Sequence, residues 1–178
     1  MVSTTDRVLQ LGDPRLRLVA APVDLEDPAF PGERERLHAT LAAFRAEYGF
    51  GRAIAAPQIA ILKRFIAADL GEGPFTLIDP VIVWRSDEVF KLWDDCMCFP
   101  TLLVRVQRAA SISVEYTDEA GDRVRMGPLD RATSELLQHE IDHLDGVLAV
   151  DRAVGPEAVI SREAYALHRA LFDATLDG

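Results

Sequence analysis

The chain of 178 residues is poor in cysteine, in histidine and in basic side chains. It has 2 Cys, 4 His, and 19 Lys and Arg against 29 Asp and Glu, which gives a formal net charge of -10. A chain this acidic lacks the basic surface that non-specific binding to nucleic acid or to anionic membranes requires. The composition therefore predicts neither nucleic acid nor a membrane as a direct partner.

Long hydrophobic runs are also missing. No stretch of about 18 apolar residues is present, so no membrane span is expected. The N-terminal stretch MVSTTDRVLQLGDP has no basic segment followed by a long apolar run, so we do not expect a secretory signal. Two cysteines without such a signal are typical of cytosolic thiols, and the expected location is the cytoplasm.

The chain does contain enough apolar residues, 49%, for a hydrophobic core, and we expect one domain over residues 1–178. The apolar pattern predicts helices over 33–48, 130–144 and 157–171 and a strand over 64–70. It also predicts an extended arm over 8–23 with a turn at residues 12–14, a strand pair around Asp79–Pro80 and a hairpin over 110–126. Gly49 ends the first helix, and Gly146 follows the second, where a left-handed cap is expected. Strands grouped between helices predict an α+β fold, with mixed or antiparallel sheets around a buried helix, and with an N-terminal and a C-terminal helix.

The strongest chemical motif is HEIDH at residues 139–143. Positions four apart lie on one face of a helix, so His139 and His143 can direct two imidazoles at one metal ion. Glu140 is placed to act on water at such a metal. The same pattern could be an exposed helix face, but apolar neighbours such as Leu137 predict a buried helix, whose polar groups need partners.

A catalytic site of the zinc type uses three protein ligands and one open position for water. The other histidines, His38 and His168, lie on predicted surface helices and are expected to be solvated. Carboxylates are so numerous that the sequence does not single one out as the third ligand. The other side chain that commonly binds such a metal is a cysteine thiolate. Cys96 and Cys98 both lie in WDDCMCFP. By spacing alone this pair could be a redox couple, half of a zinc site, or one functional thiol beside a bystander.

Three motifs in order connect these residues to a known family. The chain has GRAIAAPQ at 51–58, DDCMC at 94–98 and QHEIDH at 138–143. It thereby resembles the peptide deformylases, which carry GxGxAAxQ, EGCLS and QHExDH. The flanks LGDPRLRLVAAPV, LIDP and HLDGVLAVDR are similar to that family as well. The resemblance therefore extends over nearly the whole chain.

The resemblance implies a metal site and a reaction. Cys96 would be the third ligand beside His139 and His143, and the metal would be Fe²⁺, with Zn²⁺ or Ni²⁺ able to occupy the same site. The implied reaction is hydrolysis of the N-formyl group of N-formylmethionyl nascent peptides, with release of formate. The expected partner is an N-formylated peptide, as a nascent chain at the ribosome, or a small formamide.

The resemblance also implies the catalytic groups. Glu140 would be the general base and acid. Gln58 would donate a hydrogen bond to the substrate carbonyl oxygen as charge develops on it, and the backbone N–H of Met97 would be the second donor. Each such donor typically contributes about 3 kcal/mol to the stability of the transition state.

The segment around the cysteines departs from the family pattern. Asp94 replaces the family's glutamate, and we expect it to pair with Arg108 as structural support. Asp95 replaces a glycine, so a positive φ there would be less well tolerated, and its carboxylate could alter the electrostatics of the metal. Cys98 replaces a serine, and we expect it to be a small buried residue rather than a metal-binding or redox group.

The implied pocket for the methionine side chain also departs from the pattern. Its residues would be Gly51, Arg52, Ala53 and Glu135. Ala53 replaces a glycine, and Arg52 and Glu135 replace aliphatic residues. The two charged residues could pair while their stems line the pocket, could recognise a polar or charged substrate side chain, or could both point into solvent.

These departures leave alternatives to deformylation of formyl-methionyl peptides. One is a related hydrolase acting on a different N-formyl amine or small metabolite, and another is a metal-binding homologue without turnover. Gln58 and Glu140 argue against the second, because pure binding needs neither residue. An ordinary metalloprotease is disfavoured by the cysteine ligand and by the AAPQ sequence.

Overall fold

The computed structural model describes residues 6–176; residues 1–5, at the start of the stretch in which no signal was expected, and 177–178 lie outside the described residues. The helices are α1 (Phe30–Tyr48), α2 (Arg131–Leu144), α3 (Arg162–Leu167) and α4 (Arg169–Asp173), with 3₁₀ turns at Pro14–Arg17, Ala56–Ile59, Ala149–Arg152 and Ala174–Leu176. The strands are β1 (Ala53–Ala55), β2 (Phe65–Asp69), β3 (Pro74–Arg85), β4 (Val89–Asp95), β5 (Leu102–Ala109), β6 (Ile112–Thr117), β7 (Arg123–Met126) and β8 (Val159–Ser161).

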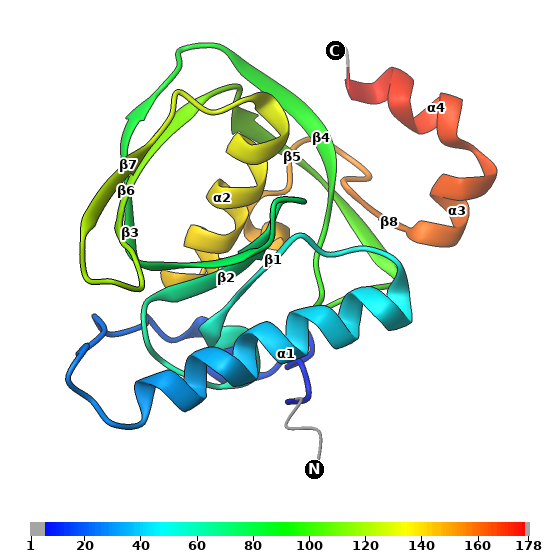
Figure 1. Cartoon of the computed structure of the whole chain (residues 1–178). Coiled ribbons are helices and arrows are strands. Elements are labelled where there is room, and N and C mark those ends of the chain that lie inside the picture. Colours follow the sequence, from blue (N-terminus) through cyan, green and yellow to red (C-terminus); the bar gives the residue numbers. More distant parts are fainter. Residues whose placement is uncertain (1–5, 177–178) are drawn as a thin grey trace.

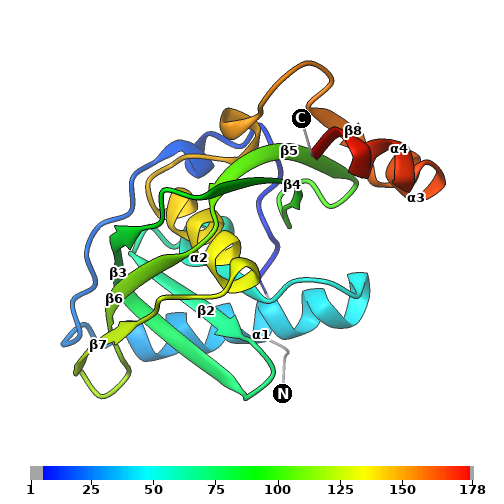
Figure 2. The ribbon, with the colours of Figure 1, turned by 90° about the horizontal axis from the view of Figure 1, so that it is seen from above.

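Two sheets surround helix α2 (Figure 1). The larger sheet has the strand order β1-β2-β3-β6-β7, and the smaller one has the order β4-β5-β8. Helix α2 contacts β1 of the larger sheet and β5 of the smaller one, whereas α1 packs against β1 and β2 from outside (Figure 2). Neighbouring strands pair antiparallel in both sheets. The expected α+β fold, with antiparallel sheets around a buried helix, is confirmed.

Helix α2 is the central element, and its limits follow from local chemistry. Asp130 precedes it and accepts a hydrogen bond from Thr133 N at 2.8 Å, which satisfies one of the free donors of the first turn. Gly146 follows it with φ 71°, the left-handed conformation expected there. Every residue from 136 to 144 is buried, so the polar side chains in this stretch must find partners inside the molecule.

Most of the other predicted elements are confirmed. Helix α1 begins three residues earlier than predicted, at the buried Phe30, and ends before Gly49, whose φ is 75°. Strand β2 and the hairpin β6-β7 lie where the alternation of apolar residues placed them. Within residues 6–176, no helix has the length and apolar character that crossing a membrane requires.

The prediction of two strands around Asp79–Pro80 is wrong. Strand β3 continues through this dipeptide, and its register with β6 shifts between Ile78 and Val81. Asp79 has φ 48°, and its Oδ1 accepts a hydrogen bond from Val23 N at 3.0 Å. An irregularity of this kind absorbs the proline without ending the strand.

The prediction of one helix over 157–171 is also wrong. Its start is strand β8, in which Ser161 pairs with Leu102 at the edge of β5. The Ser161 side chain then accepts a hydrogen bond from Ala164 N and starts α3. His168, with φ -128°, separates α3 from α4. Pairing with β5 is a long-range contact, which a helical period in the sequence does not reveal.

Candidate metal centre

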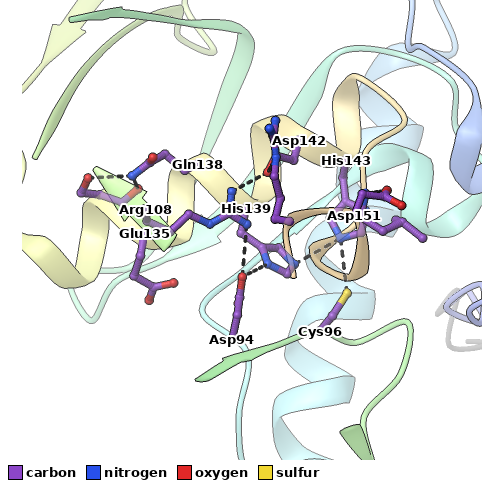
Figure 3. A network of polar contacts seen from close by, with 12 residues as sticks. Asp94, Cys96, Arg108, Glu135, Gln138, His139, Asp142, His143 and Asp151 are labelled. Atoms are coloured by element: carbon purple, nitrogen blue, oxygen red, sulfur yellow. Dashed lines mark hydrogen bonds and ion pairs between the residues drawn. The ribbon is translucent and has the colours of Figure 1, made fainter. Parts of the chain in front are cut away.

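Three candidate ligands from distant parts of the chain meet inside the molecule (Figure 3). Cys96 directly follows β4, and His139 and His143 lie on successive turns of α2. The Cys96 Sγ atom is 3.3 Å from His143 Nε2, which is 3.2 Å from His139 Nε2. All three side chains are buried. The spacing of HEIDH therefore places both imidazoles on one side of α2, facing the thiol.

The donor set fits a divalent metal ion. Burial holds the pKa of His143 well below its usual value, so this imidazole is neutral, as a metal ligand must be. Burial raises the pKa of the Cys96 thiol well above its usual value, and a nearby cation would offset that cost. One sulfur and two imidazole nitrogens are the ligands that zinc-type ions prefer. A metal ion at this point would be within reach of the Cys96 sulfur and of both Nε2 atoms.

A chain of ion pairs fixes the orientation of His139. Asp94 Oδ2 lies 3.0 Å from His139 Nδ1 and 3.2 Å from Arg108 Nη2. Arg108 also donates to Asp142, which accepts from Arg152 Nη2 at 2.8 Å. Because Asp94 accepts from the Nδ1–H group, the Nε2 atom of His139 is directed at the other ligands.

The same aspartate controls the charge of His139. Burial lowers the pKa of this imidazole, but Asp94 outweighs burial and raises the pKa to about 10. The metal-free protein therefore carries a proton on His139 at neutral pH, and metal binding must release it.

Glu140 lies beside the ligands, with its carboxylate buried and 4% of the residue exposed. Its Oε2 atom has no hydrogen-bond partner among the described residues. Burial raises the pKa of this carboxyl to about 7. A carboxyl with this pKa is close to equally protonated and ionised at neutral pH, which suits a group that accepts and returns a proton.

Gln58 directs its amide N–H group at the two thiols. Its Oε1 atom accepts a hydrogen bond from Ala55 N at 2.8 Å, which fixes the amide orientation. Its Nε2 atom lies 3.9 Å from Cys96 Sγ and 3.6 Å from Cys98 Sγ. The amide N–H group of Gln58 therefore faces the candidate metal centre. The family resemblance implies that this group donates a hydrogen bond to the substrate.

Gly51 has φ 108°, a backbone conformation that residues with a side chain rarely adopt. A Cβ built on it would lie 2.5 Å from Cε, the flexible end of the Met97 side chain. Met97 is buried, and it lies between Cys96 and Cys98 in the sequence. The glycine that begins GRAIAAPQ is therefore required mainly by its backbone conformation.

A cavity of about 370 Å³ opens beside these residues. Its lining includes the catalytic and ligand candidates His139, Glu140, Gln58, Cys96 and Met97, and also the pocket candidates Gly51, Arg52, Ala53 and Glu135. Arg52 Nη2 forms an ion pair with Glu135, and its Nη1 donates to Ala132 O at 3.0 Å. Of the three arrangements considered from the sequence, the structure has the paired one.

Glu135 is the more buried partner of that pair, since 15% of its side chain is exposed against 41% for Arg52. Burial raises the pKa of Glu135 to about 7, and Asp94 adds to the rise, whereas Arg52 opposes it. The pair formed by Arg52 and Glu135 therefore lines the cavity, and burial makes ionisation of the Glu135 carboxyl unfavourable.

The replacement of the family's glycine by Asp95 causes no backbone strain. Asp95 is the last residue of β4 and pairs with Leu103, and the non-glycine residues with positive φ in the described chain are others. Its carboxylate accepts from Arg162 Nη2 at 3.0 Å, and the guanidinium of Arg162 lies 4.2 Å from the centre of the Phe50 ring. The carboxylate is thus bound to the C-terminal segment, and it is balanced by a cation.

Two of the remaining expectations concern histidines. His168 is exposed, as expected. The expectation for His38 is wrong, because this residue is half-buried and its Nε2 atom lies 2.9 Å from Thr76 Oγ1. Burial lowers its pKa. The side of α1 that carries His38 faces Thr76 of β3 in the larger sheet, which the helical period alone could not indicate.

Asp142, Arg152 and Arg162 support the site but were not singled out from the sequence. A signal existed for the first two, since Asp142 lies inside QHEIDH and Arg152 ends HLDGVLAVDR. Arg162 follows a strand that the sequence pattern did not reveal.

A second, larger cavity of about 980 Å³ runs along the N-terminal arm, near residues 6–15. Most of its charged side chains form ion pairs, as Arg36 does with Asp6 and Lys63 does with Glu33. It contains none of the candidate ligands, so its size does not make it the functional site.

A buried Cys-His-His set beside a glutamate of raised pKa is typical of metallohydrolase centres. Comparison with known proteins gives the family. Residues 5–158 match the model of the polypeptide deformylase family. The peptide deformylase of Thermotoga neapolitana is 34% identical over 157 residues, which are 88% of this chain and 92% of the relative. The chain therefore belongs to the polypeptide deformylase family.

Solved structures agree with this assignment. The crystal structure of peptide deformylase from Thermotoga maritima matches with a TM-score of 0.77 and 34% identity, covering 85% of this chain and 99% of that one. The Met-Ala-Ser-bound structure of the class I type b enzyme from Acinetobacter baumannii matches with a TM-score of 0.75 and 28% identity, covering 85% and 99%.

Proposed function

We propose that this chain removes the N-formyl group from N-formylmethionyl peptides and releases formate and a free amine. The observation that carries the proposal is the buried Glu140 carboxyl beside the converging candidate ligands, with an Oε2 atom that has no hydrogen-bond partner within residues 6–176. Family membership supports it, since the curated relatives are peptide deformylases and one similar structure holds the peptide Met-Ala-Ser.

Cys96, His139 and His143 would hold one divalent metal ion. Such an ion would polarise the formyl carbonyl and lower the pKa of water in the site. The family and the donor set support a divalent metal, and we propose Fe²⁺ as the native one. Zn²⁺ and Ni²⁺ suit the same ligands, so availability in the cell decides among them.

Glu140 moves the proton. Its Oε2 atom accepts a proton from the attacking water as the new C–O bond forms at the formyl carbon. The protonated carboxyl then delivers that proton to the amine nitrogen as the C–N bond breaks. The raised pKa, about 7, lets the same group do both at neutral pH.

Gln58 and Met97 stabilise the charge that develops on the formyl oxygen. The Gln58 amide is already oriented by Ala55 N and needs little rearrangement to donate. The backbone N–H of Met97 is the second donor in this proposal. Donors fixed before the reaction cost no reorganisation during it, which is why they favour the transition state.

The cavity lined by Arg52 and Glu135 receives the first side chain of the substrate. The ion pair leaves the methylene groups of Arg52 available for contact with a methionine side chain. We propose that the natural substrate is the N-formylated end of a nascent chain, met in the cytoplasm at the ribosome.

Formate release from a formyl-methionyl tripeptide tests the function. The protein is purified anaerobically and loaded with iron, and an unformylated tripeptide serves as the blank. We expect turnover with bound metal. Bound metal without turnover on this peptide, but with turnover on another formamide, would replace the proposed substrate. Bound metal without turnover on any formamide would overturn the enzymatic function.

A further inference from the structure

Cys98 lies next to the metal centre although the chemistry above does not use it. Its side chain is a free thiol with 1% of the residue exposed. The ligand atoms of Cys96, Cys98 and His143 all lie within 4.8 Å of one another. A tetrahedral site with metal–ligand bonds of about 2.0–2.3 Å holds its ligand atoms somewhat closer than that, so modest side-chain rotation would bring these together.

The loop between β4 and β5 explains why both thiols face the same point. Phe99 N donates to Cys96 O at 3.2 Å, which closes a tight turn over residues 96–99. Within this turn the backbone N–H of Cys98 lies 3.4 Å from Cys96 Sγ. Leu11 N donates to Cys98 O at 2.9 Å and ties the turn to the N-terminal arm. The second sulfur is therefore held near the first by backbone contacts.

The polar surroundings of Cys98 match those of a ligand. Gln58 Nε2 lies closer to Cys98 Sγ than to Cys96 Sγ, at 3.6 Å against 3.9 Å. An amide N–H group of this kind commonly supports a metal-bound thiolate from outside the ligand set. A serine at the same place would offer a hydroxyl, which is a much poorer ligand for a zinc-type ion than a thiolate.

We propose that Cys98 is a second thiolate ligand, so that the metal has a closed resting state held by Cys96, Cys98, His139 and His143. Four protein ligands leave no position for water, as in structural zinc sites. Turnover then requires Cys98 to leave the metal. The thiol loses its proton to solvent when it binds and takes one up when it leaves.

The proposal has a consequence for the choice of metal. Two sulfur and two nitrogen ligands in a tetrahedron favour zinc, whereas one sulfur with an open position is less selective. The zinc-loaded protein should therefore be held mainly in the closed state. The proposal rests on the proposed function only for the presence of a metal in this site.

X-ray absorption of the zinc-loaded, fully reduced protein tests the proposal directly. We expect about two sulfur neighbours per zinc at about 2.3 Å in the wild type and about one in Cys98→Ser and Cys98→Ala. With Co²⁺ in place of zinc, the thiolate-to-cobalt charge-transfer absorbance per metal should fall by about half in both variants. The serine variant keeps the volume of the side chain, and the alanine variant removes any ligand atom.

The possible results distinguish a failure of the closed state from a failure of the proposed deformylase function. One sulfur neighbour in the wild type would overturn the closed state, and formate release from the same sample would leave the function standing. Failure to bind metal would overturn both. The closed state also predicts that Cys98→Ser raises kcat in the zinc-loaded protein, and an unchanged kcat with two sulfur neighbours would show that Cys98 does not block water.

Discussion

Glu140 places a buried carboxyl group beside the cavity, and its Oε2 atom, which has no hydrogen-bond partner among the described residues, is the group that the proposed reaction uses. Glu140→Gln removes the proton acceptor but keeps the shape of the side chain. We expect kcat for formate release to fall by about 10²–10⁴-fold, because proton transfer by a positioned side chain typically contributes this much. Metal content, measured by elemental analysis, should be unchanged. Retained activity would remove Glu140 as the proton carrier.

Glu135 makes the stability of the protein depend on pH. Its carboxyl pKa is raised from 4.5 to about 7 in the folded state, first because of burial. The folded state therefore favours the protonated form, and stability falls as the pH rises from about 4.5 to about 7. Glu135→Gln cannot ionise and avoids that loss.

The prediction for Glu135 concerns the metal-free protein, whose charges are those described. The melting temperature of Glu135→Gln minus that of the wild type should increase between pH 5 and pH 8. Glu163→Gln removes a carboxylate from an exposed position on α3 and controls for the loss of charge alone. A constant or decreasing difference for Glu135→Gln would show that the ion pair with Arg52 outweighs burial.

At the scale of elements, helix α2 and the hairpin β4-β5 are joined through buried charges. Arg108 of β5 lies between Asp94 of β4 and Asp142 of α2, with 5% of its side chain exposed. Breaking such a network leaves a buried charge with fewer partners, which is costly. The orientation of the candidate ligand His139 therefore depends on a contact between two elements that are far apart in the sequence.

Asp94→Asn tests this connection. The asparagine keeps the shape but loses the charge that holds the Nδ1–H group of His139, so we expect metal affinity to fall by about 10–100-fold. Competition with a chelator measures the affinity. Asp95→Asn is a matched control, because it changes the adjacent residue, whose partner is Arg162 and not a ligand. Equal losses in both variants would contradict the role of Asp94.

The elements differ in how far the sequence could predict them. Helix α2 was predictable because its start, apolar period and end are all local signals, from Asp130 to Gly146. The hairpin β4-β5 was not, since β4 is mainly half-buried, β5 is mainly buried, and neither strand shows a clear alternation. The prediction of one helix over 157–171 was wrong although its local signal was clear. The helical period is present, but pairing with β5 makes the start of the segment a strand.

For the whole molecule, the candidate ligands were predictable from motif order, whereas their support was not. His139 and His143 follow from helical spacing, and Cys96 follows from the family resemblance. The positions of Arg152 and Arg162 depend on how distant segments pack, as does the short distance from Gln58 to Cys98. Long-range packing of this kind leaves little local signal in one sequence.

The whole molecule should also be more stable with metal than without it, because the candidate ligands, from the loop after β4 and from α2, meet only in the folded chain. A metal that binds the folded state alone adds about 2.7 kcal/mol of stability at a free concentration about 100 times its dissociation constant. For a chain of this size that corresponds to a rise in melting temperature of about 5–10 °C. Calorimetry of chelator-treated and metal-reloaded protein measures the rise, and Cys96→Ala should abolish most of it. A full rise in Cys96→Ala would place the metal elsewhere, whereas a loss confined to that variant and absent from Asp95→Asn would tie the stabilisation to the loop between β4 and β5.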